Sequence, residues 1–261
     1  MPGLFDLTGH TALVAGGTGG IGQVLARALL ECGANVAVSG QSQTKADRVA
    51  EDLGGSARVL ALSGNARRPG DLDRLVEATV ERFGRLDIVV NCIGGNARHA
   101  AEDYPEDDWD RILDLNLKAA FLLSRGAARH MLRQPRRDGS AVAGKILHVS
   151  SVRSQLGIHS GYAAYCAAKG GLNVLVKQLA TEWADRGILV NAIAPTFIRT
   201  EQVADMLGDP AFHQSLVQRI PLGRVGETDD LIGPMLLFVS HASDFVTGQI
   251  LFVDGGLTAC Q

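Results

Sequence analysis

The chain has 261 residues, of which 46% are hydrophobic and 20% charged, and its formal net charge at pH 7 is −3. This composition is typical of a globular protein with a sizeable core, and the charge offers no basic face to a nucleic acid. No segment approaches the roughly 18 consecutive apolar residues of a membrane span, and the first residues lack the basic and apolar runs of a signal peptide. The four cysteines form no C-x-x-C pair or metal-ligand spacing. We therefore expect a cytoplasmic protein with reduced thiols, no metal site, and neither a nucleic-acid nor a membrane partner.

Short apolar runs alternate along the chain with segments of helical period. Strands that alternate with helices predict right-handed βαβ units, and hence an α/β fold with one doubly wound parallel sheet of about seven strands. No linker or low-complexity segment divides the chain, so we expect a single domain. The expected strands cover residues 11–15, 35–39, 58–62, 86–91, 145–150, 188–194 and 249–254. The expected helices begin near residue 21 and then cover 44–53, 71–83, 107–131, 162–186 and 227–240.

A glycine-rich turn directly follows the first expected strand. It reads Gly16-Gly17-Thr18-Gly19-Gly20-Ile21-Gly22, and a helical pattern begins within it. Glycine permits positive φ and close backbone approach, and the free N–H groups of a helix N-terminus attract a pyrophosphate. This strand–turn–helix context indicates a dinucleotide cradle. Its predicted members are Gly16, Thr18, Gly20, Ile21 and Gly22.

A second motif supplies acid–base groups. Tyr165 and Lys169 are four residues apart, which places them on one face of a helix. A nearby cation lowers the pKa of a tyrosine toward the working range. Ser150 and Ser151 end an expected strand, where a hydroxyl can hydrogen-bond the same substrate oxygen. These groups are suited to the interconversion of an alcohol and a carbonyl.

Together these residues resemble the short-chain dehydrogenase/reductase family over nearly the whole chain. The resemblance implies a Rossmann-type, NAD(P)-dependent oxidoreductase of CH–OH groups, with residues 1–261 as a single dinucleotide-binding catalytic domain. The alternative is a non-catalytic dinucleotide-binding sensor, a class that often loses the catalytic residues. The matching motifs, in the family's order, are GGTGGIG at 16–22, NCIG at 91–94, LNL at 115–117, HVSS at 148–151, YCAAK at 165–169, NAIAPTFIRT at 191–200 and VTGQILFVDGG at 246–256.

The resemblance implies a catalytic tetrad of Asn116, Ser151, Tyr165 and Lys169. Asn116 would hold an ordered water through its backbone carbonyl and bend its helix locally. Ser151 would orient the substrate oxygen, and Tyr165 would be the general acid and base. Lys169 would lower the pKa of Tyr165 and bind the nicotinamide ribose. Tyr162 is followed four residues later by Cys166 rather than lysine, so it is assigned no catalytic role.

Further cofactor contacts are implied at the ends of successive strands. Ile198 would contact the carboxamide through its backbone, and Thr200 through its hydroxyl. Asn65 stands where the family usually has an aspartate that binds the adenine amino group, and an amide can still accept that hydrogen bond. The implied contacts beyond the glycine turn are Gln41, Asn65, Ala66, Asn91, Gly94, Tyr165, Lys169, Pro195, Ile198 and Thr200.

The choice between NAD and NADP is expected at the end of the second strand. An acid there binds the ribose hydroxyls of NAD and repels a 2′-phosphate. Gly40 occupies this position and Gln41 the next, while Lys45 and Arg48 can reach a 2′-phosphate as point charges. The sequence therefore favours NADP over NAD.

The substrate is less defined than the chemistry. Segments 108–116 and 221–249 resemble gluconate 5-dehydrogenases and related keto-acid or polyol reductases, and almost as closely 3-oxoacyl-[acyl-carrier-protein] reductases. We expect a small-molecule carbonyl/alcohol substrate, first a sugar acid or polyol, with Arg153, His159, Arg199 and Gln202 as candidate contacts. Residues 197–225 are expected to form a substrate lid, with a plain amphipathic helical connection as the alternative.

Family members are usually tetramers. The resemblance places their interfaces on the helices over 107–131 and 162–186 and on the C-terminal strand. The apolar run Ile250–Val253 fits such an interface, although a core strand explains it equally well. We expect a homotetramer.

Overall fold

Seven parallel strands form one sheet in the order β3-β2-β1-β4-β5-β6-β7. The computed structural model describes residues 3–55, 57–137, 139–159 and 161–260. The prediction of one doubly wound parallel sheet is confirmed, and each strand lies within two residues of its expected range. The strands are β1 Thr11–Ala15, β2 Asn35–Gly40, β3 Val59–Ser63, β4 Ile88–Asn91, β5 Gly144–Val149, β6 Ile188–Pro195 and β7 Ile250–Val253.

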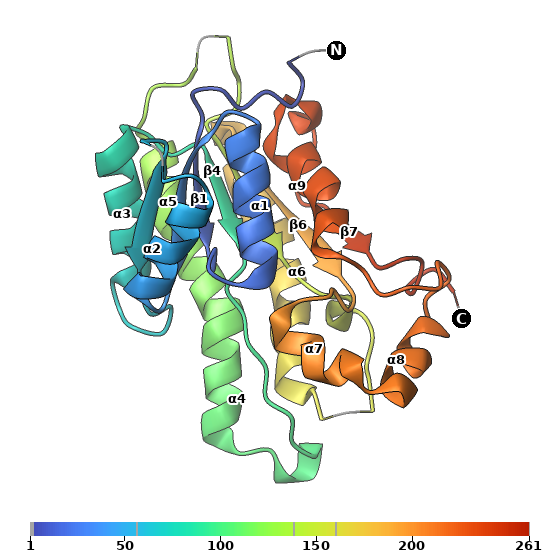
Figure 1. The fold of residues 1–261 in the computed structure, drawn as a ribbon. Helices are drawn as coiled ribbons and strands as arrows, with labels where there is room; N and C mark the ends of the chain where they lie inside the picture. Colours follow the sequence, from blue (N-terminus) through green and yellow to red (C-terminus); the bar gives the residue numbers. More distant parts are fainter. Residues whose placement is uncertain (1–2, 56, 138, 160, 261) are drawn as a thin grey trace.

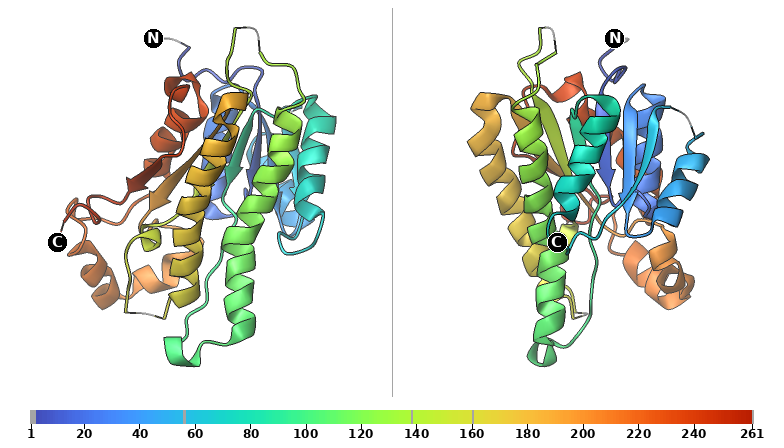
Figure 2. Two further views of the ribbon diagram at one scale, coloured as in Figure 1. Left: turned by 180° about the vertical axis from the view of Figure 1, so that it is seen from behind. Right: turned by 90° about the vertical axis from the view of Figure 1, so that its left-hand side faces the viewer.

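Helices cover both faces of the sheet (Figures 1 and 2). On one face lie α1 Gly20–Glu31, α2 Gln43–Asp52 and α9 Ile232–Val239, which enclose a core around Leu25 and Met235. On the other face lie α3 Asp71–Phe83, α5 Ala119–Met131 and α6 Ala163–Trp183, around Leu123 and Val176. Central strands buried on both faces consist of continuous apolar runs, which is why the sequence showed them clearly. Short 3-10 turns lie at Ala101–Asp103, Val152–Ser154, Ala184–Arg186, Thr228–Leu231 and His241–Ser243.

The expected helix over 107–131 is interrupted at Asn116. It consists of α4 Glu106–Leu113, a π-helical turn at Asp114–Lys118 and α5. The Nδ2 of Asn116 donates to the carbonyls of Ile112 and Gly95, each at 2.9 Å. The side chain thus satisfies a carbonyl of its own helix and links the π-helical turn to the loop after β4. The resemblance implied a local bend of the helix at Asn116, and the structure has a π-helical turn there.

Two short helices occupy the segment over 197–225, α7 Glu201–Gly208 and α8 Pro210–Val217. Asp209 separates them, and its side chain accepts from the backbone N of Ala211 at 2.9 Å. The two ends of the segment are joined, because Gly226 N donates to Phe197 O at 3.0 Å and Arg199 N donates to Gly226 O at 2.8 Å. The pair therefore forms a separate excursion with closed ends (Figure 1).

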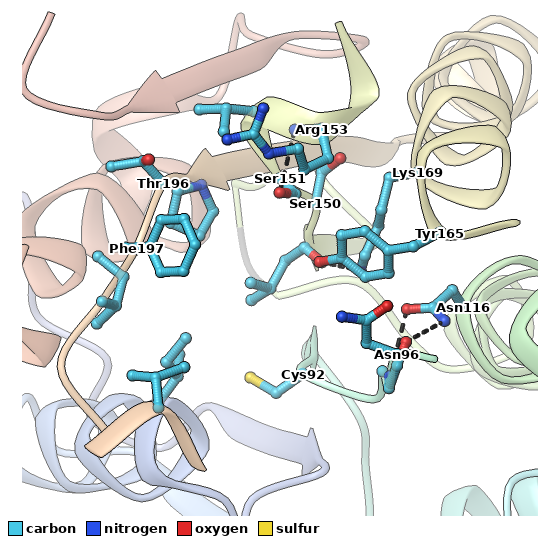
Figure 3. Close-up of a pocket in the computed structure, with 18 of the residues that line it drawn as sticks. Cys92, Asn96, Asn116, Ser150, Ser151, Arg153, Tyr165, Lys169, Thr196 and Phe197 are labelled. Atoms are coloured by element: carbon cyan, nitrogen blue, oxygen red, sulfur yellow. Dashed lines mark hydrogen bonds between the residues drawn. The ribbon is translucent and has the colours of Figure 1, made fainter. Parts of the chain in front are cut away.

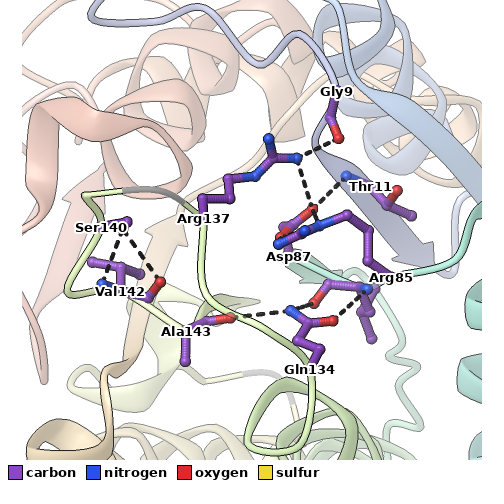
Figure 4. A network of polar contacts seen from close by, with 10 residues as sticks. Gly9, Thr11, Arg85, Asp87, Gln134, Arg137, Ser140, Val142 and Ala143 are labelled. Atoms are coloured by element: carbon purple, nitrogen blue, oxygen red, sulfur yellow. Dashed lines mark hydrogen bonds and ion pairs between the residues drawn. The ribbon is translucent and has the colours of Figure 1, made fainter.

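A polar network fixes the opposite end of the sheet, at the amino ends of the strands (Figure 4). Asp87, which precedes β4, accepts from Thr11 N at 2.9 Å and pairs with Arg85 at 2.6 Å. Arg137 reaches the same carboxylate at 3.4 Å and also bonds the carbonyl of Gly9. Gln134 donates to Leu86 O at 2.8 Å. Gln134 and Arg137 thus anchor the connection between α5 and β5 to the sheet.

None of the described helices combines the length and the apolar character needed to cross a bilayer.

Candidate active site

The carboxyl ends of the central strands surround one pocket. The order of the strands reverses between β1 and β4, and ligands of such sheets bind outside this point. The pocket has a volume of about 260 Å³ and is formed by the loops after β4, β5 and β6, by α6 and by the start of α7 (Figure 3). Nine of the predicted catalytic and cofactor-binding residues share its wall: Ile21, Gly94, Asn116, Ser151, Tyr165, Lys169, Pro195, Ile198 and Thr200.

The glycine turn has the geometry of an anion cradle. Gly16 has a φ of +77°, and a Cβ there would lie 2.8 Å from the carbonyl carbon of Cys92. A Cβ on Gly22 would lie 2.7 Å from the Cα of Gly17 and closer still to the carbonyl oxygen of Gly16. In the described structure, Gly19 caps α1 without a side-chain hydrogen bond. The first N–H groups of α1 therefore face the turn uncapped, at the positive end of the helix dipole. These features fit the pyrophosphate of a dinucleotide.

Tyr165, Ser151 and Lys169 form one cluster between β5 and α6, in which Ser151 and Lys169 are buried and Tyr165 is half-buried. The side chain of Ser151 hydrogen-bonds Tyr165, and Lys169 Nζ lies 5.7 Å from the centre of the tyrosine ring. Lys169 is 3% exposed and donates to Val149 O at 2.9 Å. The helical spacing of four residues therefore brings the phenol and the ammonium together, and the end of β5 supplies the hydroxyl.

Burial governs the protonation of this cluster. Burial raises the pKa of Tyr165 above its ordinary value of 10, and the hydrogen bond from Ser151 opposes this effect. Burial also lowers the pKa of Lys169 to about 8. The sequence predicted that Lys169 would lower the pKa of Tyr165, but the ammonium lies against the ring and the carbonyl of Val149. Tyr165 is therefore protonated at neutral pH.

A family model described as "Enoyl-(Acyl carrier protein) reductase" matches residues 15–258. The chain belongs to the short-chain dehydrogenase/reductase family. It is 36% identical to gluconate 5-dehydrogenase of Gluconobacter oxydans, over 98% of each chain. It is 35% identical to a 3-oxoacyl-[acyl-carrier-protein] reductase of Synechocystis, over 96% of this chain and 98% of the relative.

Solved structures of this family have the same fold. A gluconate 5-dehydrogenase from Burkholderia cenocepacia, in complex with NADP and tartrate, superposes with a TM-score of 0.91 and is 34% identical. The superposition covers 99% of this chain and 98% of the neighbour.

Other predicted cofactor contacts lie around the pocket rather than in its wall. Gln41 is exposed after β2. The Oδ1 of Asn65 accepts from Arg67 N at 3.0 Å, which holds the loop after β3 that includes Ala66. The side chain of Asn91 bonds the ring of His148 at 3.1 Å and accepts from Ile93 N at 3.1 Å, so it braces β4 against β5. Gly94 and Pro195 do lie in the pocket wall.

The four candidate substrate contacts lie in different environments in the structure. Only Arg153 lines the pocket. Arg199 is half-exposed and pairs with Glu227 at 3.0 Å, His159 is exposed, and the side chain of Gln202 lies outside the described part.

Asn96 and Phe197 line the pocket and were not among the predicted site residues, and Tyr162, which the sequence analysis assigned no catalytic role, lines it as well. Tyr162 packs edge-on against Tyr165 with ring centres 6.1 Å apart, and Arg98 lies 5.3 Å above its ring. Tyr162 directly precedes α6, the helix that follows β5. This position beyond the carboxyl end of a strand was the available signal, because ligands bind at that edge of the sheet.

Proposed function

We propose that this protein is an NADP-dependent oxidoreductase that interconverts a secondary hydroxyl and a ketone on a sugar acid. The observation that carries the proposal is the cluster of Ser151, Tyr165 and Lys169 on the wall of a pocket whose neighbour is the glycine cradle. A sensor of the same fold has no need for a phenol beside a buried ammonium in its ligand pocket.

The residues divide the chemistry among them. Tyr165, protonated at neutral pH, donates its proton to the ketone oxygen during reduction. In oxidation its phenolate form takes the proton from the substrate hydroxyl. Ser151 hydrogen-bonds the same oxygen and holds it against the phenol. Lys169 places a positive charge below the ring and near the ribose position. When bound, the nicotinamide supplies or accepts the hydride.

Asn116 keeps these parts in register. Its amide joins α4 to the loop at Gly95 through bonds in both directions, with Nδ2 to Gly95 O at 2.9 Å and Gly95 N to Oδ1 at 3.4 Å. A Cβ on Gly94 would lie 3.0 Å from Asn116 Oδ1 and 3.7 Å from Lys169 Nζ, so this loop leaves the amide and the ammonium adjacent. A water held by the backbone carbonyl of Asn116 would extend this chain toward Lys169.

NADP is the cofactor that the residues after β2 favour. Position 40 is a glycine, so no carboxylate meets a 2′-phosphate there, and Lys45 and Arg48 of α2 are exposed nearby. Gln41 and Asn65 bind the adenosine end, and the backbone of Ile198 and the hydroxyl of Thr200 bind the carboxamide. The Burkholderia neighbour was crystallised with NADP.

A sugar acid is the substrate supported by the relatives. The Gluconobacter relative is named for gluconate and two relatives from Escherichia coli for 5-keto-D-gluconate and 2-dehydro-3-deoxy-D-gluconate. A 3-oxoacyl thioester is the second candidate. The apolar side chains of Phe197 and Val203 on one wall favour it, because they suit an acyl chain.

The excursion of α7 and α8 acts as a lid over the substrate. Leu207, Leu216 and Val225 give it a small core of its own, separate from the two cores of the sheet, while Phe197 and Val203 face the pocket. A unit with its own core and closed ends can move as a body about residues 198 and 226.

The protein assembles as a homotetramer in the cytoplasm. Phe121 on α5 is 41% exposed and Val174 on α6 is 67% exposed, and both lie on the helices where the family forms its interfaces. All four cysteines are free thiols, as a reducing compartment maintains them. Light scattering after gel filtration measures the mass, and a monomer of 27.6 kDa would contradict the tetramer.

The direct test of the proposed function is the absorbance at 340 nm. NADPH or NADH is mixed with the protein and with 5-ketogluconate or an acetoacetyl thioester. Oxidation of NADPH with 5-ketogluconate supports the proposal, and reduction of the thioester alone assigns the second candidate. Binding of NADPH without turnover of either compound contradicts both.

A further inference from the structure

Arg153 is a buried cation in the substrate pocket. It follows Ser151 by two residues, in the 3-10 turn Val152–Ser154, and is 7% exposed. Figure 3 shows it at one end of the pocket and Cys92 at the other, with Ser151 and Tyr165 between them. Cys92 lies beside the glycine cradle. The guanidinium therefore lies on the side of the catalytic hydroxyls away from the pyrophosphate position.

No carboxylate neutralises this guanidinium within the part of the chain that the structure describes. Its hydrogen bond there is from Nη1 to Gly157 O at 3.1 Å. The groups that act on its charge are Arg219, which repels it, and the weakly acidic Cys166, Tyr162 and Tyr165. By contrast, Arg85, Arg111 and Arg224 are all more exposed, and each pairs with an aspartate.

An unpaired buried charge is costly. A guanidinium stays protonated in a protein, so Arg153 cannot reduce this cost by losing its proton. The favourable arrangement is one in which a ligand supplies the missing negative charge. The planar fork of an arginine matches a carboxylate with two parallel hydrogen bonds.

We infer that Arg153 binds the carboxylate of the substrate and so sets which carbon faces Ser151 and Tyr165. This inference rests on the proposed function and adds the residue that recognises the carboxylate of the sugar acid. The backbone N of Arg153 donates to Ser151 Oγ at 3.1 Å, so the guanidinium and the hydroxyl belong to one short turn. The turn fixes the separation between the carboxylate and the reacting oxygen. A 3-oxoacyl thioester lacks a carboxylate at this place and leaves Arg153 unpaired.

The test compares gluconate with gluconamide, which has the same carbon chain without the charge. Calorimetry measures their binding to the NADPH complex of the wild-type protein and of two variants. Arg153→Gln removes the charge and keeps a donor for Gly157. Arg224→Gln, the control, removes an exposed arginine that is paired with Asp230.

The wild-type protein and Arg224→Gln are expected to bind gluconate about a hundredfold more tightly than gluconamide, and Arg153→Gln to bind both equally weakly. Arg153→Lys should recover part of the preference, whereas NADPH affinity and melting temperature should not change in any variant. Equal affinities in the wild-type protein, a preference retained in Arg153→Gln, or no binding of gluconate would overturn the inference.

Turnover of 5-ketogluconate is measured separately on the same samples. Gluconate that binds through Arg153 without turnover of the ketone would contradict the proposed function alone. Turnover with an unchanged KM and kcat in Arg153→Gln would contradict the role of Arg153 alone.

Discussion

The side chain of Thr18 fills the space beside the Cα of Gly40. A Cβ at position 40 would lie 2.7 Å from Thr18 Cγ2 and closer still to Thr18 Oγ1. Thr18 belongs to the glycine turn after β1, and Gly40 ends the neighbouring strand β2. Position 40, where we expect the choice between the two cofactors, is thus in direct contact with the turn that we propose binds their pyrophosphate.

This contact predicts that cofactor preference cannot be changed at residue 40 alone. Gly40→Asp should weaken both NADPH and NADH by about tenfold or more, because the new side chain displaces Thr18. The double variant Thr18→Gly/Gly40→Asp should bind NADH more tightly than NADPH, because its carboxylate repels the 2′-phosphate. Fluorescence titration of the wild-type protein, the single variants Thr18→Gly and Gly40→Asp, and the double variant measures the coupling. Additive effects of the two substitutions would count against the contact.

The two glycines of the turn at 19 and 22 should differ in their tolerance of a methyl group. Gly22→Ala places a Cβ 2.7 Å from Gly17 Cα and should lower NADPH affinity about tenfold or more, because the turn must open. Gly19→Ala is the matched control, since its Cβ meets its nearest atom, Gly16 O, at an ordinary 3.5 Å. Isothermal titration with NADPH separates the two. Equal losses would show that the close approach at Gly22 is not what shapes the cradle.

The raised pKa of Tyr165 predicts opposite pH profiles for the two directions of the reaction. Oxidation needs the phenolate, whose fraction rises about tenfold per pH unit below the pKa, so its kcat/KM should increase up to and beyond pH 10. Reduction needs the phenol, which is already fully populated at pH 7, and its rate should not rise with pH. Both are measured at saturating cofactor, because Lys169 loses its charge near pH 8. An oxidation rate that levels off below pH 8 would assign the base to another group.

Asp87 should stabilise the protein at neutral pH and lose this effect in acid. Burial raises the pKa of its carboxyl, but hydrogen bonds from Arg85 and Thr11 N outweigh burial, and the net pKa lies below the ordinary value. A lowered folded-state pKa gives stability that is complete above about pH 4 and disappears as the pH falls through that folded value.

Asp87→Asn should therefore cost about 2 kcal/mol in the free energy of unfolding at pH 7 and less at pH 3, where the carboxylate is being protonated in the wild-type protein as well. This value is reduced because Arg85 and Arg137 can turn toward water. Urea unfolding at both pH values measures the change. Asp185→Asn, at an 82% exposed side chain, is the control and should have no effect. Equal costs for Asp87→Asn at both pH values would contradict the role of its charge.

The sequence was most informative where a local pattern has one structural solution. Buried parallel strands consist of continuous apolar runs, so β1 was predicted with its observed bounds. The Tyr165–Lys169 spacing likewise needs only a helix to bring the two side chains together.

Contacts between residues far apart in the chain could not be predicted from the sequence. The spacing of four residues does not show that Lys169 Nζ donates to Val149 O. Burial raises the pKa of Tyr165, so the expected lowering of that pKa was wrong. Arg153, His159 and Arg199 looked equivalent as polar loop residues, and only burial and the partner Glu227 distinguish them. Thr18 follows β1 and Gly40 ends β2, and Thr18 would clash with any side chain at position 40. Neither segment read alone predicts this contact.

The central claim is that this pocket transfers a hydride to a sugar-acid ketone with Tyr165 as the proton donor. The most direct measurement uses NADPH that carries deuterium at both C4 positions, together with 5-ketogluconate, and mass spectrometry of the product. The wild-type protein should produce an alcohol with one deuterium on the former ketone carbon, and Tyr165→Phe should do so about a hundredfold more slowly with unchanged NADPH affinity. An unlabelled product, or a rate in Tyr165→Phe close to that of the wild-type protein, would contradict the claim.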